Sequence, residues 1–207
     1  MTDRSGFSLA PLDSLEAAVL TDDVSDAYVI KTLFAVSEFS NIVRGGAKVI
    51  SGETLLCANL GFGLRLVSTA GGVRHTVLFD TGPEGAIFIR NCANLGIPLG
   101  EVECIAVTHG HWDHMAALPA AIDAIIRQGG KVTVHVNPGM FNERAIKLKS
   151  GTIVPVANVP LPSEMESLGA TVVNNSAKRL LLDGHFYYSG EIPRVSAFEK
   201  GRVDHLS

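Results

Sequence analysis

The residues most suited to chemistry in this sequence lie in one run of six positions, His109-Gly110-His111-Trp112-Asp113-His114. In an extended turn, residues two apart project to the same side, so His109 and His111 can bind one ion together. Asp113 and His114 follow one step further along and are placed for a second ion close to the first. Imidazole and carboxylate ligands suit zinc, iron or manganese, and the run contains no thiolate of the kind that closes a structural zinc site.

The alternative for this run is a solvated, histidine-rich loop that binds no ion. Its flanks argue against that alternative. Residues 102–107 read as a short buried strand, and residues 115–128 carry apolar positions at helical spacing. The run is therefore predicted to lie on a strand-to-helix turn, at the carboxyl end of a strand, where α/β sheets bind their ligands.

Two stretches carry a family resemblance. Thr108-His109-Gly110-His111-Trp112-Asp113-His114 resembles the signature of the metallo-β-lactamase superfamily, and Leu78-Phe79-Asp80-Thr81-Gly82 resembles its second landmark. A third stretch, Ser189-Gly190-Glu191-Ile192-Pro193-Arg194, resembles one subgroup. That subgroup includes the synthases that make a dihydropterin-linked ribofuranosylaminobenzene 5'-phosphate. The resemblance extends over 15–201, with a gap at 22–58.

The resemblance implies roles for individual residues. His109 and His111 would hold one divalent metal ion, zinc first and iron or manganese as alternatives, while Asp113 and His114 would hold a second. Asp113 would also be catalytic, because it would orient the nucleophile. Asp80 would lie behind the loop and orient it by hydrogen bonding, although its position before residue 84 also suits a helix cap.

The implied function is that of a metal-dependent hydrolase, or of a transferase like the dihydropterin-phosphate synthases. The substrate would be a small molecule, such as a phosphorylated compound or an acyl ester. Glyoxalase II and lactonase activities share the same motif. The alternative from another class is a catalytically incomplete half-domain that acts as a binding or assembly subunit.

Composition limits the other classes. With 207 residues, 46% hydrophobic and 18% charged, the chain has the size and composition of one globular domain, taken here as 1–207. A net charge of -4 and the absence of long Lys/Arg runs argue against nucleic-acid binding. No apolar stretch approaches the roughly 20 residues that span a membrane, and no secretory signal is recognisable. Three unpatterned cysteines favour a cytoplasmic protein with reduced thiols.

The hydrophobic pattern predicts strands and helices that alternate. Predicted strands cover 15–21, 62–68, 73–79, 102–107, 131–136, 152–156, 171–174, 179–182 and 186–188. Predicted helices cover 28–39, 84–95, 115–128 and part of 160–168. Residues 22–58 form either a lid over the site or a plain surface excursion. The resulting expectation is an α/β (α+β type) fold: one mixed sheet with flanking helices, as in the N-terminal half of a metallo-β-lactamase αββα sandwich.

The resemblance also implies ligands that this sequence does not supply. The family takes further histidines from strands downstream of the stretch that ends at Arg194. Here only His185 and His205 follow, and neither has the expected context. His135 alternates with valines and reads as structural, and Asn137 stands where a histidine is expected. We therefore expect a C-terminally incomplete domain, with an uncovered apolar sheet face that favours a dimer or a complementing C-terminal half.

Overall fold

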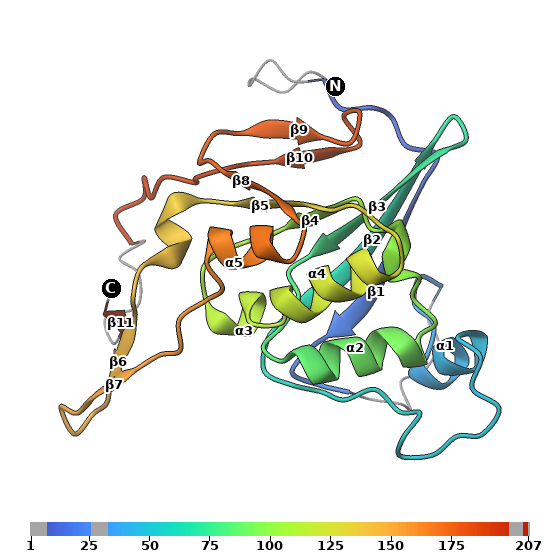
Figure 1. Cartoon of the computed structure of the whole chain (residues 1–207), viewed down its shortest axis with the longest axis horizontal. Helices are drawn as coiled ribbons and strands as arrows, with labels where there is room; N and C mark the ends of the chain where they lie inside the picture. Colours follow the sequence, from blue (N-terminus) through green and yellow to red (C-terminus); the bar gives the residue numbers. More distant parts are fainter. Residues whose placement is uncertain (1–7, 26–32, 199–204, 207) are drawn as a thin grey trace.

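The chain is built around a six-stranded mixed sheet (Figure 1). A computed structural model describes residues 8–25, 33–198 and 205–206. The sheet has the strand order β1-β2-β3-β4-β5-β8. Its strands are β1 (Ser14–Thr21), β2 (Gly63–Ala70), β3 (Val73–Phe79), β4 (Cys104–Ala106), β5 (Thr133–Val136) and β8 (Thr171–Asn174). The first three are antiparallel neighbours, whereas β3, β4, β5 and β8 run parallel.

Helices cover one face of this sheet (Figure 1). The helices of the chain are α1 (Glu38–Arg44), α2 (Gly85–Asn94), α3 (Trp112–Met115), α4 (Leu118–Arg127) and α5 (Pro162–Ser167), with 3-10 turns η1 (Leu99–Glu101) and η2 (Pro138–Phe141). On α4, Leu118, Ile122 and Ile125 recur at helical spacing and are fully buried. Burial of each such side chain contributes about 1.5–3 kcal/mol, so this stripe fixes α4 against the sheet. The predicted mixed sheet with flanking helices is confirmed.

The opposite face of the sheet is partly covered by a small hairpin of β9 (Arg179–Leu181) and β10 (Phe186–Tyr188). Leu181 and Tyr188 pack there against Val77, Cys104 and Ala106. The expectation of an uncovered apolar face is therefore wrong over β3 and β4.

The same face remains open over β1. Leu15 lies opposite Ser68 and Val19 opposite Leu64, so both point to the side that carries the hairpin. Their side chains are 56% and 48% exposed. The hairpin therefore leaves an apolar strip at this edge of the sheet.

A three-stranded ribbon of β6 (Ala145–Lys147), β7 (Ile153–Pro155) and β11 (His205–Leu206) projects away from the main sheet (Figure 1). The sequence pattern predicts the second of these strands only. Strands β6 and β11 are absent from the prediction, and all three strands have only two or three residues.

Two predicted helices differ from the structure. The helix expected over 115–128 begins only with α4 at Leu118, after the separate short helix α3, because Pro119 has no backbone N–H and fits only in the first turn of a helix. The helix expected over 28–39 lies partly outside the described residues. Within 33–37 the chain is not helical, and α1 begins only at Glu38, where the Ser37 side chain accepts a hydrogen bond from the Ser40 N–H.

The segment that precedes β2 is fastened to α2. Asn94 donates to the carbonyls of Glu53 and Leu55, and Arg90 donates to that of Gly52. The suggested lid over 22–58 stays a prediction, because residues 26–32 lie outside the description. In the part of the chain that the structure describes, no helix is long and apolar enough to cross a membrane.

Candidate metal centre

Residues His109–His114 are here called the metal loop. They follow β4 in the middle of the sheet and include the first three residues of α3. Strand β4 lies between β3 and β5, so the loop begins at the carboxyl end of a central parallel strand. The N–H groups of His114 and Met115 bond to the carbonyl of His111, which begins the short helix α3. The predicted strand-to-helix turn is confirmed.

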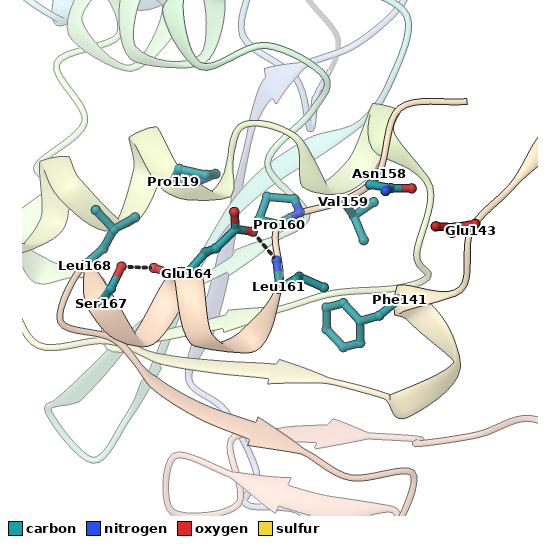
Figure 2. Close-up of a pocket in the computed structure, with 10 residues that line it drawn as sticks. All are labelled: Pro119, Phe141, Glu143, Asn158, Val159, Pro160, Leu161, Glu164, Ser167 and Leu168. Carbon is teal, nitrogen blue, oxygen red and sulfur yellow. Dashed lines mark hydrogen bonds between the residues drawn. The ribbon is translucent and has the colours of Figure 1, made fainter. Parts of the chain in front are cut away.

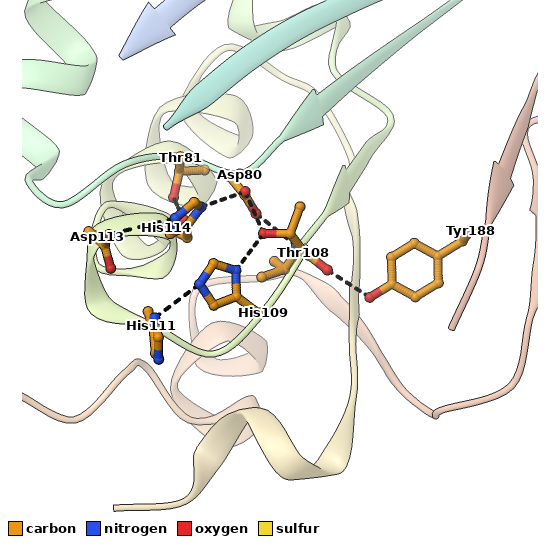
Figure 3. Close-up of polar contacts among 9 residues, drawn as sticks. Asp80, Thr81, Thr108, His109, His111, Asp113, His114 and Tyr188 are labelled. Atoms are coloured by element: carbon orange, nitrogen blue, oxygen red, sulfur yellow. Dashed lines mark hydrogen bonds and ion pairs between the residues drawn. The ribbon is translucent and has the colours of Figure 1, made fainter. Parts of the chain in front are cut away.

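Asp80 ties the two ends of the metal loop together. Its side chain is fully buried and its backbone has a φ of 58°, a left-handed conformation that is uncommon outside glycine. One carboxylate oxygen accepts from the Thr108 N–H at 2.8 Å. The other accepts from the Thr108 hydroxyl and from His114 Nδ1, both at 2.7 Å (Figure 3).

Asp80 does not cap α2. The N-cap of that helix is Glu84, and no side-chain hydrogen bond caps it. From the sequence, Asp80 is expected either to orient the loop or to cap the helix, and among the described residues the structure shows only its side-chain hydrogen bonds to Thr108 and His114.

These hydrogen bonds fix the tautomers of two histidines. The single hydroxyl hydrogen of Thr108 goes to Asp80, so Thr108 must accept from His109 Nδ1–H at 3.0 Å. The lone pair of His109 is then on Nε2. Similarly, His114 donates from Nδ1 to a carboxylate, which leaves its lone pair on Nε2. When neutral, both histidines thus carry on Nε2 the lone pair that could bind a metal ion.

The candidate ligand atoms lie in two pairs. His109 Nε2 lies 3.0 Å from His111 Nδ1, and His114 Nε2 lies 3.6 Å from a carboxylate oxygen of Asp113. Figure 3 shows the three imidazole rings gathered beside Asp113, with the ring centroids of His109 and His114 4.2 Å apart.

The electrostatics of the two outer histidines differ. Burial, with the nearby His114 and His111, lowers the pKa of His109 to about 4, so its imidazole is neutral at pH 7. Burial acts to lower the pKa of His114 as well. The hydrogen bond to Asp80 and the charges of Asp80 and Asp113 outweigh that effect and raise the pKa.

The side chains fit divalent ions as two pairs. Two ligand atoms of one tetrahedral zinc ion, each about 2.0–2.2 Å from it, lie about 3.3 Å apart. The separations of 3.0 and 3.6 Å are close to this value. Among the described residues, no three His, Cys, Asp or Glu side chains are arranged to hold one ion. Each ion would therefore have two protein ligands and open positions.

The other histidines lie elsewhere. His135 is buried on β5 beside the ring of Tyr188, and burial and Arg179 lower its pKa to about 4. His185 bonds to the buried Ser68 hydroxyl at 2.9 Å, and its ring contacts that of His75. His205 lies in β11, and its side chain is outside the description.

A pocket of about 670 Å³ opens beside His109. It is bounded by the metal loop, by η2, by Arg144 and by residues 187–194. The stretch Ser189–Arg194, noted in the sequence for its subgroup resemblance, thus borders the candidate site.

A second cavity, of about 770 Å³, lies between α4 and α5 (Figure 2). Its walls include Pro119, Phe141 and Leu168 but no residue of the metal loop. It therefore has no direct part in the candidate centre.

Two contacts of the site are absent from the sequence prediction. The Tyr188 hydroxyl donates to the Val107 carbonyl at 2.8 Å, just before the metal loop (Figure 3). Arg144 donates to the carbonyls of Gly139, Met140 and Asn142. The sequence hint for the first is the position of Tyr188 directly before the Ser189–Arg194 stretch. The second has no sequence signal.

The comparison with protein families bears on this region. Residues 66–165 match the family model described as the metallo-beta-lactamase superfamily. The match supports membership of that superfamily. It contains both Asp80 and the metal loop, and it ends before Ser189, so the subgroup resemblance lies outside it.

Solved structures give distant likenesses. The chain is 18% identical to the metallo-beta-lactamase MIM-1 of Novosphingobium pentaromativorans, with a TM-score of 0.36 over 62% of this chain and 43% of that one. It is 16% identical to a putative metallo-beta-lactamase of Thermotoga maritima, with a TM-score of 0.37 over 82% of this chain and 63% of that one. The chain thus spans less than two thirds of either protein. No curated protein matches.

Proposed function

We propose that this chain is a metal-dependent hydrolase of the metallo-beta-lactamase type. The observation that carries the proposal is the Asp80 carboxylate, which bonds at once to Thr108 and His114 and so leaves Nε2 of His109 and of His114 as the candidate metal-binding atoms. A carboxylate behind a metal-binding histidine orients the ring and raises its basicity. A solvated, histidine-rich loop has no need of a fully buried carboxylate that fixes two of its side chains.

Each residue has a defined part in this proposal. His109 and His111 hold one divalent ion, and Asp113 and His114 hold the other, with zinc as the first candidate and iron or manganese as alternatives. When bound, such ions act as Lewis acids and lower the pKa of water to near neutrality. Asp113, 23% exposed at its side chain, would orient the attacking water. The pocket beside His109 receives the substrate.

The test is turnover by the metal-loaded chain on a panel of esters. We expect hydrolysis of at least one class among thioesters, lactones, phosphomonoesters and phosphodiesters, with loss of turnover in Asp113→Asn. The matched control is Asp123→Asn, which changes an exposed aspartate of α4 that pairs with Arg127 and lies outside the metal loop. Turnover that survives in Asp113→Asn, or that falls equally in both variants, would contradict the proposal.

A transferase like the dihydropterin-phosphate synthases is a second candidate. It is favoured by the position of Ser189–Arg194 on the wall of the pocket beside His109. Condensation of a pterin with a phosphorylated acceptor, in place of ester hydrolysis, would support this candidate.

A non-catalytic binding or assembly subunit is the third candidate. The exposed Leu15 and Val19 and the absence of a three-ligand set among the described residues favour it. Such a subunit would dimerise or bind a complementing partner. A monodisperse monomer that keeps two equivalents of metal after dialysis would exclude this candidate.

A further inference from the structure

The pocket beside His109 is positively charged, although the chain as a whole carries a net charge of -4. Arg144 and Arg194 line it, against one carboxylate, Glu191. Within the described part of the chain, neither arginine forms an ion pair with an acidic side chain. Two guanidinium groups therefore line one pocket without forming an ion pair with a described acidic side chain, which leaves them available to an anionic ligand.

Arg144 is held in place by backbone carbonyls alone. Its Nη1 donates to Met140 and Asn142 at 2.9 Å each, and its Nη2 donates to Gly139 at 3.1 Å. Three of the five guanidinium N–H groups are thereby used, which leaves Nε–H and one Nη2–H. Burial lowers the pKa of Arg144 from its ordinary high value, and the group remains a cation at neutral pH.

Arg144 is also adjacent to the metal loop. A Cβ on Gly110 would lie 2.1 Å from the Met140 carbonyl oxygen, which is the atom that Arg144 binds. The loop and η2 are therefore in direct backbone contact at Gly110. The Arg144 guanidinium thus binds the same Met140 carbonyl that packs against Gly110, the residue between the candidate ligands His109 and His111.

Arg194 lines the same pocket but comes from a different segment of the chain. It is exposed, and it ends the segment 187–194, most of whose residues line the pocket. Gly190 in this segment has a φ of 67°, and a Cβ there would lie 2.3 Å from the Ser176 carbonyl oxygen. The Glu191 N–H bonds to that same carbonyl. The segment is therefore fastened where it passes the pocket.

From this arrangement we infer that the pocket binds the oxyanion of an anionic substrate, phosphate or carboxylate, between Arg144 and Arg194. This inference rests on the proposed function for the identity of the reacting end, which would lie at His109. Tyr187, Tyr188 and Met140 on the pocket walls supply apolar and aromatic surface for the body of the substrate. A volume of about 670 Å³ suits a small organic molecule. Guanidinium groups bind planar and tetrahedral oxyanions through paired N–H donors.

The test measures binding to the full chain after metal removal by chelator, so that no ion contributes to affinity. The probes are phenyl phosphate, benzoate and the neutral benzamide, titrated by calorimetry or NMR. We expect saturable binding of phenyl phosphate or benzoate but not of benzamide. Arg194→Gln should weaken oxyanion binding about 10-fold, and Arg194→Lys should restore part of it, because a charge-assisted hydrogen bond is lost in the first and replaced in the second.

Arg74→Gln is the matched control, because Arg74 is an exposed arginine on β3 that does not line the pocket. Binding of phenyl phosphate alone indicates a phosphate-bearing substrate, and binding of benzoate alone indicates a carboxylate. The inference fails if neither anion binds, if benzamide binds equally well, or if Arg194→Gln and Arg74→Gln behave alike. Oxyanion binding by a chain that hydrolyses nothing when loaded with metal would count against the proposed function only.

Discussion

At the scale of single residues, Asp80 has the most consequential contacts in the site. Its two oxygens accept three hydrogen bonds and are excluded from solvent. This carboxylate therefore shapes the metal loop, since it engages Nδ1 of His114 and, through Thr108, Nδ1 of His109, and leaves Nε2 of each ring as the candidate metal-binding atom.

Replacement of this carboxylate tests that role. Asp80→Asn keeps the side-chain volume but replaces one acceptor oxygen by an NH2 donor. That NH2 must face either the Thr108 N–H or the pair formed by the Thr108 hydroxyl and His114 Nδ1, and all of these are donors to Asp80. We expect zinc affinity to fall about 10–100-fold and the free energy of unfolding to fall by about 1–3 kcal/mol. Chelator competition and chemical denaturation measure the two effects.

The control for this variant is Asp123→Asn, which removes an exposed ion pair with Arg127. We expect it to change stability by less than about 1 kcal/mol and to leave zinc affinity as it is. An Asp80→Asn chain with unchanged zinc affinity would show that the carboxylate serves packing alone.

The sequence alone predicts some of the residues of the site but not others. The spacing of His109, His111, Asp113 and His114 is legible in the sequence because the four residues are local. The role of Asp80 comes from a resemblance, and the bond from Tyr188 to Val107 spans 81 positions. No local pattern encodes a contact of that length, so it becomes visible only in the fold.

At the scale of elements, the β9–β10 hairpin connects the far face of the sheet to the metal loop. Tyr188 packs with Val77, Cys104 and Ala106, and its buried hydroxyl reaches the Val107 carbonyl. Burial raises the pKa of Tyr188 to about 12, so the hydroxyl remains a donor across the physiological range. The hairpin thus helps to fix the strand end from which the loop begins.

Removal of that hydroxyl is the test at this scale. Tyr188→Phe keeps the ring in the apolar cluster and leaves the buried Val107 carbonyl without its partner. We expect a loss of about 1–2 kcal/mol in unfolding free energy, with a smaller fall in zinc affinity than in Asp80→Asn. Equal stability of the wild-type and Tyr188→Phe chains would indicate that the hydrogen bond contributes nothing net.

The elements themselves follow well from the sequence where apolar periodicity is strong. The hairpin of β2 and β3 turns at Gly71 and Gly72, both with positive φ, as two glycines between alternating strands predict. The helix prediction is wrong where apolar residues at helical spacing are not buried. The apolar residues near Phe34 have helical spacing, yet Leu33 and Phe34 are 95% and 98% exposed and lie before α1.

At the scale of the whole molecule, buried histidine on the second face makes stability depend on pH. His135 is 8% exposed, its Nδ1 has no hydrogen-bond partner among the described residues, and its pKa is lowered to about 4 by burial and by Arg179. In the unfolded chain its pKa returns to about 6.5. Between pH 6.5 and 4, the unfolded chain therefore binds a proton that the folded chain does not.

The stability that the neutral, buried His135 contributes is fully present above pH 6.5 and is lost as the pH falls toward 4. We expect the metal-free chain to lose stability between pH 7.5 and 5, and His135→Gln to lose about 1–2 kcal/mol less over the same interval. Urea denaturation at the two pH values measures this difference. Parallel pH dependence in the two chains would show that His135 is not desolvated in the folded state.

The central claim is that the metal loop binds two divalent ions through two pairs of side chains. Elemental analysis after dialysis against zinc-free buffer tests it most directly, on the wild-type, His111→Ala and His135→Ala chains. We expect two equivalents of zinc in the wild type and in His135→Ala, and a loss of at least one equivalent in His111→Ala. Equal metal loss from the two variants, or a wild-type chain that retains no metal, would contradict the account.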